Sequence, residues 1–325
     1  MSLQGKTVLV TGGAGFIGSH LTDALLAAGC FVRVLDNFST GHRENLSSAL
    51  EDPSFTLIEG DIRDMAACRH AVQGCDYVFH EAALGSVPRS LASPEETVSV
   101  NVAGFVNVIT AAKDAGVQRL VYASSSSVYG DEPHLPKEED RIGTQLSPYA
   151  VSKYCNELFA ANFSACYGME LIGLRYFNVF GPRQDPEGPY AAVIPKFIKC
   201  LKKHLSPVIN GDGTNSRDFT YIRNVVQVNL LALTAGNDAV NTVYNVACGE
   251  RTDLNELFSM VRAELAAFDP AIGAVTAEHG PNRAGDIPHS LASIAKAVRL
   301  LGYKPECSVK EGLRAAAEWY YRNLD

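Results

Sequence analysis

Short apolar runs alternate with longer amphipathic segments through the first 180 residues of the chain. Brief apolar runs rich in Val, Leu, Ile and Phe are typical of buried strands. The segments between them repeat apolar residues every three or four positions, which predicts helices. We predict strands at 6–10, 31–36, 55–61, 77–82, 119–125 and 170–176. We predict helices at 16–28, 65–72, 95–115 and 149–167.

This alternation favours an α/β fold, a doubly wound parallel-sheet Rossmann domain with helices on both faces. After residue 180 the pattern loosens into turn-rich loops and further segments, with helices predicted at 191–203, 223–235, 253–267 and 308–323 and a strand at 242–247. We therefore expect a Rossmann domain over residues 1–180 and a smaller mixed α/β substrate lobe over residues 181–325. An alternative for the segments around 219–247 is that they rejoin the Rossmann domain.

The chain carries a net charge of −8, which argues against non-specific binding to nucleic acid or to an anionic membrane. No apolar run approaches the length of a membrane span, and the opening residues lack the basic region of a signal peptide. We expect a soluble, cytoplasmic protein with neither a nucleic-acid nor a membrane partner.

The cysteines and histidines do not follow metal-ligand spacing. The eight cysteines contain no CxxC pair, which fits reduced, mostly buried thiols better than a zinc site or a disulfide framework. His80, His134 and His289 are not grouped either, so we expect no metal site.

A glycine-rich turn follows the first predicted strand. In "VLVTGGAGFIGSH", Gly12, Gly15 and Gly18 separate this strand from a periodic helix. Glycines at such a turn let the backbone approach a pyrophosphate, whose charge faces the free N–H groups at the helix start. A purely structural turn remains the alternative, but the strand before it and the helix after it favour a dinucleotide site.

Acidic and small residues follow the next three strands. Asp36 ends the second strand, where a carboxylate accepts both adenosine ribose hydroxyls and repels a 2′-phosphate, so it predicts NAD rather than NADP. Arg43 leaves some room for NADP. Asp61 and Ile62 end the third strand, and small residues follow His80 in "HEAAL". In open α/β sheets, ligands bind outside the carboxyl ends of the strands.

These motifs together resemble an extended short-chain dehydrogenase/reductase. The resemblance covers nearly the whole chain and includes TGGAGFIG (11–18), Asp36, Asp61-Ile62, "HEAA", Asn101, the serines 124–127, Tyr149-x-x-x-Lys153 and "RYFNVFGP" (175–182). Within that superfamily the chain resembles the UDP-hexose 4-epimerases. The stretch "AALGSVPRS" (82–90) is most similar to the branch that acts on UDP-N-acetylglucosamine and UDP-N-acetylgalactosamine.

The resemblance implies three catalytic residues, Ser125, Tyr149 and Lys153. Tyr149 would take the proton of the sugar 4-hydroxyl while NAD accepts the C4 hydride. A phenolate at neutral pH needs the tyrosine pKa lowered by about 3, which corresponds to about 4 kcal/mol. A lysine cation one helical turn away and the positive nicotinamide ring both favour the anion. Ser125 would relay the sugar proton, and the adjacent Ser126 is the alternative residue for this role.

The resemblance also implies two sets of binding residues. The cofactor set is Gly12, Gly15, Phe16, Ile17, Gly18, Asp36, Asn37, Ser39, Gly41, Asp61, Ile62, Ala82, Ala83, Asn101, Tyr149, Lys153, Tyr176 and Val179. The UDP-sugar set is Ser86, Arg89, Ser125, Ser126, Tyr149, Asn178, Ala192, Val193, Ile209, Asn210, Arg217, Arg283, Asp286 and Ser290. Arg217 and Arg283 would hold the two phosphates, because guanidinium groups suit paired oxygens.

Ser290 bears on the choice of sugar. The resemblance implies that hexose-restricted epimerases carry a bulky tyrosine there, so a serine leaves space for an acetamido group beside C2. UDP-glucose and UDP-galactose stay open as further substrates. The serine can also begin a helix. Because of Arg89, a UDP-glucuronate 4-epimerase remains an alternative function. A nucleotide-sugar dehydratase or decarboxylase is disfavoured by "SSSS" in place of acidic residues, and a non-catalytic NAD-sensing scaffold by the intact Tyr149 and Lys153. The apolar faces of 95–115 and 149–167 predict a homodimer.

Overall fold

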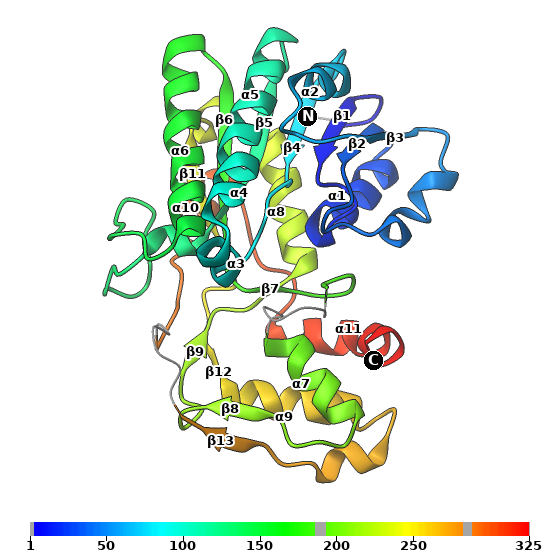
Figure 1. Ribbon diagram of the computed structural model, residues 1–325, viewed down its shortest axis with the longest axis vertical. Coiled ribbons are helices and arrows are strands. Elements are labelled where there is room, and N and C mark those ends of the chain that lie inside the picture. Colours follow the sequence, from blue (N-terminus) through cyan, green and yellow to red (C-terminus); the bar gives the residue numbers. More distant parts are fainter. Residues whose placement is uncertain (1–2, 186–192, 282–287, 325) are drawn as a thin grey trace.

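The computed structural model describes residues 3–185, 193–281 and 288–324. Its centre is a parallel seven-stranded sheet, with the strand order β11-β6-β5-β4-β1-β2-β3 (Figure 1). The strands are β1 Thr7–Thr11, β2 Phe31–Asp36, β3 Phe55–Glu59, β4 Tyr77–His80, β5 Arg119–Ser125, β6 Glu170–Tyr176 and β11 Thr242–Val246. The strand order reverses between β1 and β4, which opens a crevice at the carboxyl edge. The predicted doubly wound fold is confirmed.

Helices cover both faces of the sheet, as its buried strands require. One face carries α2 (Met65–Val72), α5 (Phe105–Asp114) and α6 (Pro148–Tyr167), and the other carries α1 (Phe16–Ala27), α8 (Ile222–Thr234) and α10 (Ala295–Leu301). Strand residues alternate between the two layers: Leu9 packs with the α5 side, whereas Val8 and Val10 pack with the α1 side. This alternation follows the period of two along a strand.

The predicted helix 95–115 is interrupted. It consists of α4 (Pro94–Val98), a π-helical turn (Ser99–Gly104) and α5. Within the π-helical turn, the buried Asn101 side chain accepts the N–H of Leu84 (2.8 Å) and donates to the Leu84 carbonyl (3.1 Å). A π-helical turn changes the direction in which a side chain leaves the helix. Here the Asn101 side chain holds the loop after β4 in place. The short helix α3 (Val87–Ala92) in this loop was not predicted.

Within the ranges that the structure describes, the second lobe contains three α-helices and short strand pairs. The helices are α7 (Val193–Lys202), α9 (Leu254–Leu265) and α11 (Val309–Asn323), and they pack on one another. The strand pairs are β8 (Val208–Asn210) with β13 (Glu278–Gly280), and β9 (Ser216–Arg217) with β12 (Thr252–Asp253). Phe197 and Phe258 meet edge to face at 5.8 Å between α7 and α9. Figure 1 shows these elements below the main sheet.

The chain passes more than once between the two lobes. β7 (Val179–Phe180) pairs in parallel with β10 (Thr220–Tyr221) at the junction. The segment after β10 forms α8 and then β11, which pairs with β6 from Thr242 to Val246. The outermost strand next to β6 therefore comes from the second half of the sequence. No helix in the described ranges is long and apolar enough to cross a membrane.

Candidate active site

A cavity of about 390 Å³ lies outside the carboxyl ends of the sheet strands. All but two of the residues predicted to bind the cofactor line it, namely Gly12, Gly15, Phe16, Ile17, Asp36, Asn37, Ser39, Gly41, Asp61, Ile62, Ala82, Ala83, Tyr149, Lys153, Tyr176 and Val179. The two exceptions, Gly18 and Asn101, are buried and do not belong to the lining. Residues from 12 to 185 in the sequence thus converge on one crevice.

The glycine turn is packed too closely for side chains. At Gly12, where φ is +70°, an added Cβ would lie 2.6 Å from the Ala82 nitrogen. At Gly18 it would lie 2.2 Å from the Gly12 carbonyl oxygen. Helix α1 begins after Gly15 without a side-chain cap, so its first N–H groups are available to an anion. The turn fits the pyrophosphate of a dinucleotide.

The Asp36 carboxylate lies at the end of β2 and contacts this glycine turn. Its oxygens accept the N–H groups of Ala14 (2.9 Å) and Phe38 (2.8 Å). Burial raises the pKa of Asp36, and these backbone donors act in the opposite direction. Asp36 lines the cavity, where its carboxylate can accept a ribose hydroxyl. Arg43, the residue that left NADP open, pairs with Glu59 at 3.0 Å.

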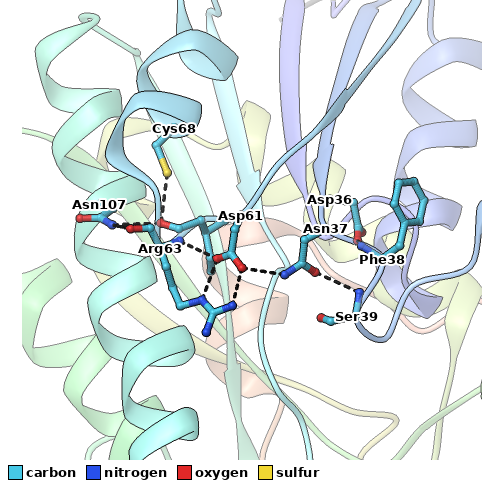
Figure 2. A network of polar contacts seen from close by, with 9 residues as sticks. Asp36, Asn37, Phe38, Ser39, Asp61, Arg63, Cys68 and Asn107 are labelled. Carbon is cyan, nitrogen blue, oxygen red and sulfur yellow. Dashed lines mark hydrogen bonds and ion pairs between the residues drawn. The ribbon is translucent and has the colours of Figure 1, made fainter.

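A polar network forms the wall beyond Asp36 (Figure 2). Asn37 donates to Asp61 at 2.8 Å, and the Arg63 guanidinium donates to both Asp61 oxygens at 3.0 and 2.6 Å. The Arg63 hydrogen bonds hold the pKa of Asp61 at about 2. Asn107 donates to the Ile62 and Arg63 carbonyls. Arg63 was not among the predicted residues, although its place two residues after Asp61 offered a signal.

The first two turns of α6 bring Tyr149 and Lys153 to the opposite end of the cavity. Ser147 caps this helix by accepting the Ala150 N–H at 3.1 Å, and Pro148 occupies its first position. The Lys153 ammonium donates to the Ala123 carbonyl at the end of β5 (3.0 Å). Burial lowers the pKa of Lys153 to about 8.

Ser125 lies at the end of β5, beside Tyr149. Its hydroxyl oxygen accepts the N–H of Ser127 (3.2 Å) and the Ser127 hydroxyl (3.0 Å). Burial raises the pKa of Tyr149, while its hydrogen bond with Ser125 acts in the other direction. Ser125, Tyr149 and Lys153 all line the cavity. This grouping places two hydroxyls and a buried ammonium where a proton can be moved.

Glu81 lines the cavity and was not among the predicted residues. It directly follows β4, and the Tyr176 hydroxyl donates to its carboxylate at 2.9 Å. Burial raises the pKa of Glu81 to about 7. The only sequence signal was a charged residue directly after a fully buried strand.

The structure brings together only part of the predicted UDP-sugar set. Asn178 lines the cavity with Ser125 and Tyr149, and its amide donates to the Asp218 carbonyl at 3.1 Å. The following predicted residues do not belong to the described cavity lining: Ser86, Arg89, Ser126, Val193, Ile209, Asn210, Arg217 and Ser290. Ser86 caps α3 by accepting the Arg89 N–H, and Ile209 is buried in β8. Ala192, Arg283 and Asp286 lie outside the described residues.

Arg217, in β9, and Ser290 nevertheless lie in neighbouring segments, which an isolated β-bridge between Ser216 and His289 joins. The Ser290 N–H donates to the Ser216 carbonyl at 3.0 Å, and an Arg217 guanidinium nitrogen donates to the same oxygen at 3.0 Å. The fully buried Asp218 accepts the N–H groups of Cys248 (2.9 Å), Gly249 (3.1 Å) and Ala292 (3.3 Å). Asp218, which directly follows Arg217, thereby holds the segment of Arg217 against the segment that contains Ser290 and Ala292.

Comparisons with known proteins agree with this geometry. A family model described as the NAD dependent epimerase/dehydratase family matches residues 8–247. Over 317 residues the chain is 36% identical to a UDP-glucose 4-epimerase of Mycolicibacterium smegmatis, covering 97% of this chain and 98% of that protein.

Two solved structures are also similar. One is a UDP-N-acetylglucosamine 4-epimerase from Methanobrevibacter ruminantium in complex with UDP-N-acetylmuramic acid (TM-score 0.92, 39% identity, 99% of this chain and 100% of that one). The other is a UDP-glucuronic acid 4-epimerase from Bacillus cereus with UDP-glucuronic acid and NAD (TM-score 0.87, 29% identity, 97% and 99%). The resemblance drawn from the motifs is confirmed. The chain belongs to the NAD-dependent epimerase/dehydratase family, and NAD is its cofactor.

Proposed function

We propose that the chain is a UDP-sugar 4-epimerase that prefers UDP-N-acetylglucosamine and UDP-N-acetylgalactosamine. The observation that carries the chemistry is the grouping of Ser125, Tyr149 and Lys153 at one end of the dinucleotide cavity. The whole-length similarity to UDP-sugar 4-epimerases supports the reaction class.

The three residues suit reversible oxidation at the sugar C4. NAD, when bound, supplies the acceptor for the C4 hydride. Tyr149 takes the proton from the 4-hydroxyl, directly or through Ser125, and returns it after the sugar has turned over. Burial alone raises the tyrosine pKa, so the phenolate needs two nearby positive charges, the Lys153 ammonium and the nicotinamide ring.

The substrate preference rests on the junction between the lobes. Arg217 is a candidate for the phosphates. Ser290 lies in the neighbouring segment, and its small side chain would leave room for an acetamido group. The similarity to a UDP-N-acetylglucosamine 4-epimerase at 39% identity supports this choice.

UDP-glucuronate is the second candidate substrate. Arg89, in α3 near the cavity loop, offers a cation for a C6 carboxylate. The similarity to a UDP-glucuronic acid 4-epimerase also supports it, at the lower identity of 29%.

The test presents UDP-N-acetylglucosamine, UDP-glucose and UDP-glucuronate separately and follows inversion at C4 through the anomeric proton by NMR. We expect the highest kcat/KM with the N-acetylated sugar. Ser290→Tyr should lower that value at least about tenfold while sparing UDP-glucose, and Ser290→Ala should change neither. Inversion of UDP-glucuronate alone would refute the preference, and inversion of no UDP-sugar would refute the reaction class.

We also propose that two copies pair through α4 and α6. Val98 on α4 and Val151, Leu158 and Phe159 on α6 are 39–53% exposed. α4 and α6 contact each other, so these side chains belong to neighbouring helices. An apolar surface of this kind is typical of a subunit interface.

A further inference from the structure

Glu81 lies among the reacting groups without a role in the proton transfer described above. Its N–H donates to the Thr11 carbonyl at 3.1 Å, which continues the β1–β4 ladder by one residue. Its side chain leaves the sheet at the cavity, whose lining also includes Ala123, Tyr149 and Lys153. The carboxylate is therefore placed by the backbone of two central strands.

A second set of contacts fixes the carboxylate itself. The Tyr176 hydroxyl at the end of β6 donates to Glu81 at 2.9 Å, and the Asn229 amide on α8 donates to that hydroxyl at 2.9 Å. Asn229 is fully buried and also donates to the Val225 carbonyl. A carboxylate held by such a chain has a fixed direction, since each donor is oriented by the next.

The fold indicates which half of the dinucleotide Glu81 faces. In a doubly wound sheet one mononucleotide binds on each side of the switch point between β1 and β4. Asp36, on β2, belongs to the adenosine side. Glu81 belongs to the other side, with Tyr149 and Lys153, where the nicotinamide must lie for hydride transfer.

We propose that the Glu81 carboxylate favours the oxidised form of the bound cofactor. The oxidised nicotinamide ring carries a positive charge and the reduced ring carries none, so a fixed negative charge beside it stabilises NAD+ relative to NADH. This bias suits an enzyme that must return every hydride to its substrate, because it opposes release of the keto sugar from a reduced enzyme.

The local charges support this assignment. Glu81 faces the Lys153 ammonium from α6 and the Tyr176 hydroxyl from β6. Burial raises the pKa of Glu81 to about 7, and Lys153 acts in the opposite direction. The positive ring would favour the ionised carboxylate further, so Glu81 is charged when NAD+ is bound.

The experiment measures the reduction potential of the cofactor in the holoenzyme, without any sugar. Wild type and Glu81→Gln are equilibrated with a redox couple of known potential, and the bound NADH is read from its absorbance. At the same potential of the redox couple, we expect about a tenfold higher ratio of NADH to NAD+ in the variant. This corresponds to a rise of about 30 mV in the reduction potential of the bound cofactor, for two electrons. A ratio within about twofold of wild type would overturn the proposal.

Two further variants separate charge from other effects. Glu81→Asp keeps the charge and should stay within about threefold of wild type. A shift as large as that of the glutamine variant would show that the Tyr176 contact, not the charge, is responsible, and would overturn the proposal. Glu51→Gln changes the same net charge at an exposed position, so it should not move the potential.

Loss of the cofactor from Glu81→Gln does not prevent the measurement. The ratio of the Kd values for NADH and NAD+ closes the same thermodynamic cycle, and we expect it to shift about tenfold toward NADH. The inference rests on the proposed hydride transfer at this end of the cavity. Its readout needs no substrate, so a failed epimerisation assay and an unchanged potential are separate results.

Discussion

Glu157 on α6 and Arg175 on β6 form a buried bidentate ion pair near the carboxyl edge of the sheet. The guanidinium of Arg175 donates to the two Glu157 oxygens at 2.9 and 2.8 Å, and the Ser124 hydroxyl donates to Glu157 at 2.5 Å. Glu157 follows Lys153 by one helical turn, and Lys153 donates to Ala123. Two successive turns of α6 are therefore bonded to two successive residues of β5, which fixes the helix that carries Tyr149 beside the strand that ends at Ser125.

Breaking this ion pair should destabilise the protein strongly. Glu157→Gln leaves the buried Arg175 charge without its partner, and we expect a loss of about 3–5 kcal/mol in the free energy of unfolding. Glu318→Gln is the matched control, because Glu318 and Arg322 form an exposed pair at 2.6 Å that is worth less than about 1 kcal/mol. Urea unfolding measures both values, and equal losses would contradict the prediction.

Removing the Tyr149 hydroxyl should abolish proton transfer without emptying the cavity. For Tyr149→Phe we expect kcat to fall by about 10²- to 10⁴-fold, with NAD still bound to the purified protein. Tyr167→Phe, at the exposed end of the same helix, should retain full activity. Turnover and NAD content are measured on the same samples; a variant at position 149 that turns over normally would remove Tyr149 from the mechanism.

Asp36 should determine cofactor choice. Asp36→Asn removes a charged acceptor from the ribose hydroxyls, so we expect Kd for NAD to rise about 10- to 100-fold and the preference over NADP to narrow. Calorimetric titration of protein freed of its cofactor gives both constants. An unchanged ratio of the NAD and NADP affinities would argue against a ribose contact.

Asp218 should make stability depend on pH. Its pKa is raised by burial to about 7 from an ordinary value near 4, so the native state holds a proton that the unfolded chain releases between these values. The stability contributed by the protonated group is complete below about pH 4 and is lost as the pH rises through about 7. The free energy of unfolding of wild type relative to Asp218→Asn should therefore fall over this range. A difference that rises with pH would reverse the sign and exclude the assignment.

The proposed dimer gives a simple prediction. Leu158→Asp places a charge on the exposed apolar face of α6 and should yield monomers, whereas Val298→Asp, on α10 at the opposite face of the sheet, should leave the dimer intact. Light scattering at micromolar protein distinguishes the two. A monomeric wild type would refute the interface.

Local sequence patterns predicted the main sheet well because its strands are nearly continuous apolar runs. The strands at 31–36, 119–125 and 170–176 have the predicted bounds. The helix expected over 95–115 contains a π-helical turn, because the Asn101 amide bonds to the backbone of Leu84, a contact that no helical periodicity reveals. The same limit applied to α3, which is too short for a periodic signal.

The site was predictable where one short motif carries the chemistry, as in the glycine turn and the Tyr149–Lys153 pair. It was not predictable where the chemistry depends on distant partners. Glu81 and Tyr176 are 95 residues apart, and Ser124 and Glu157 are 33 apart. Burial and charge in these pairs arise only after the strands align. The one local signal at Glu81 is its place directly after a buried strand, and this signal does not reveal the contact with Tyr176.

The place of β11 at the border of the sheet limits how the enzyme can be rebuilt. A chimera joined at residue 180 would exchange β11 together with the second lobe, and the donor strand would have to match the β6 side chains from Ile172 to Tyr176. A mismatch there would disturb Arg175 and Tyr176, which hold Glu157 and Glu81. If Arg217 and Ser290 contact the sugar nucleotide as proposed, grafting the separate loops around them would alter the substrate range with less disturbance than recombining halves.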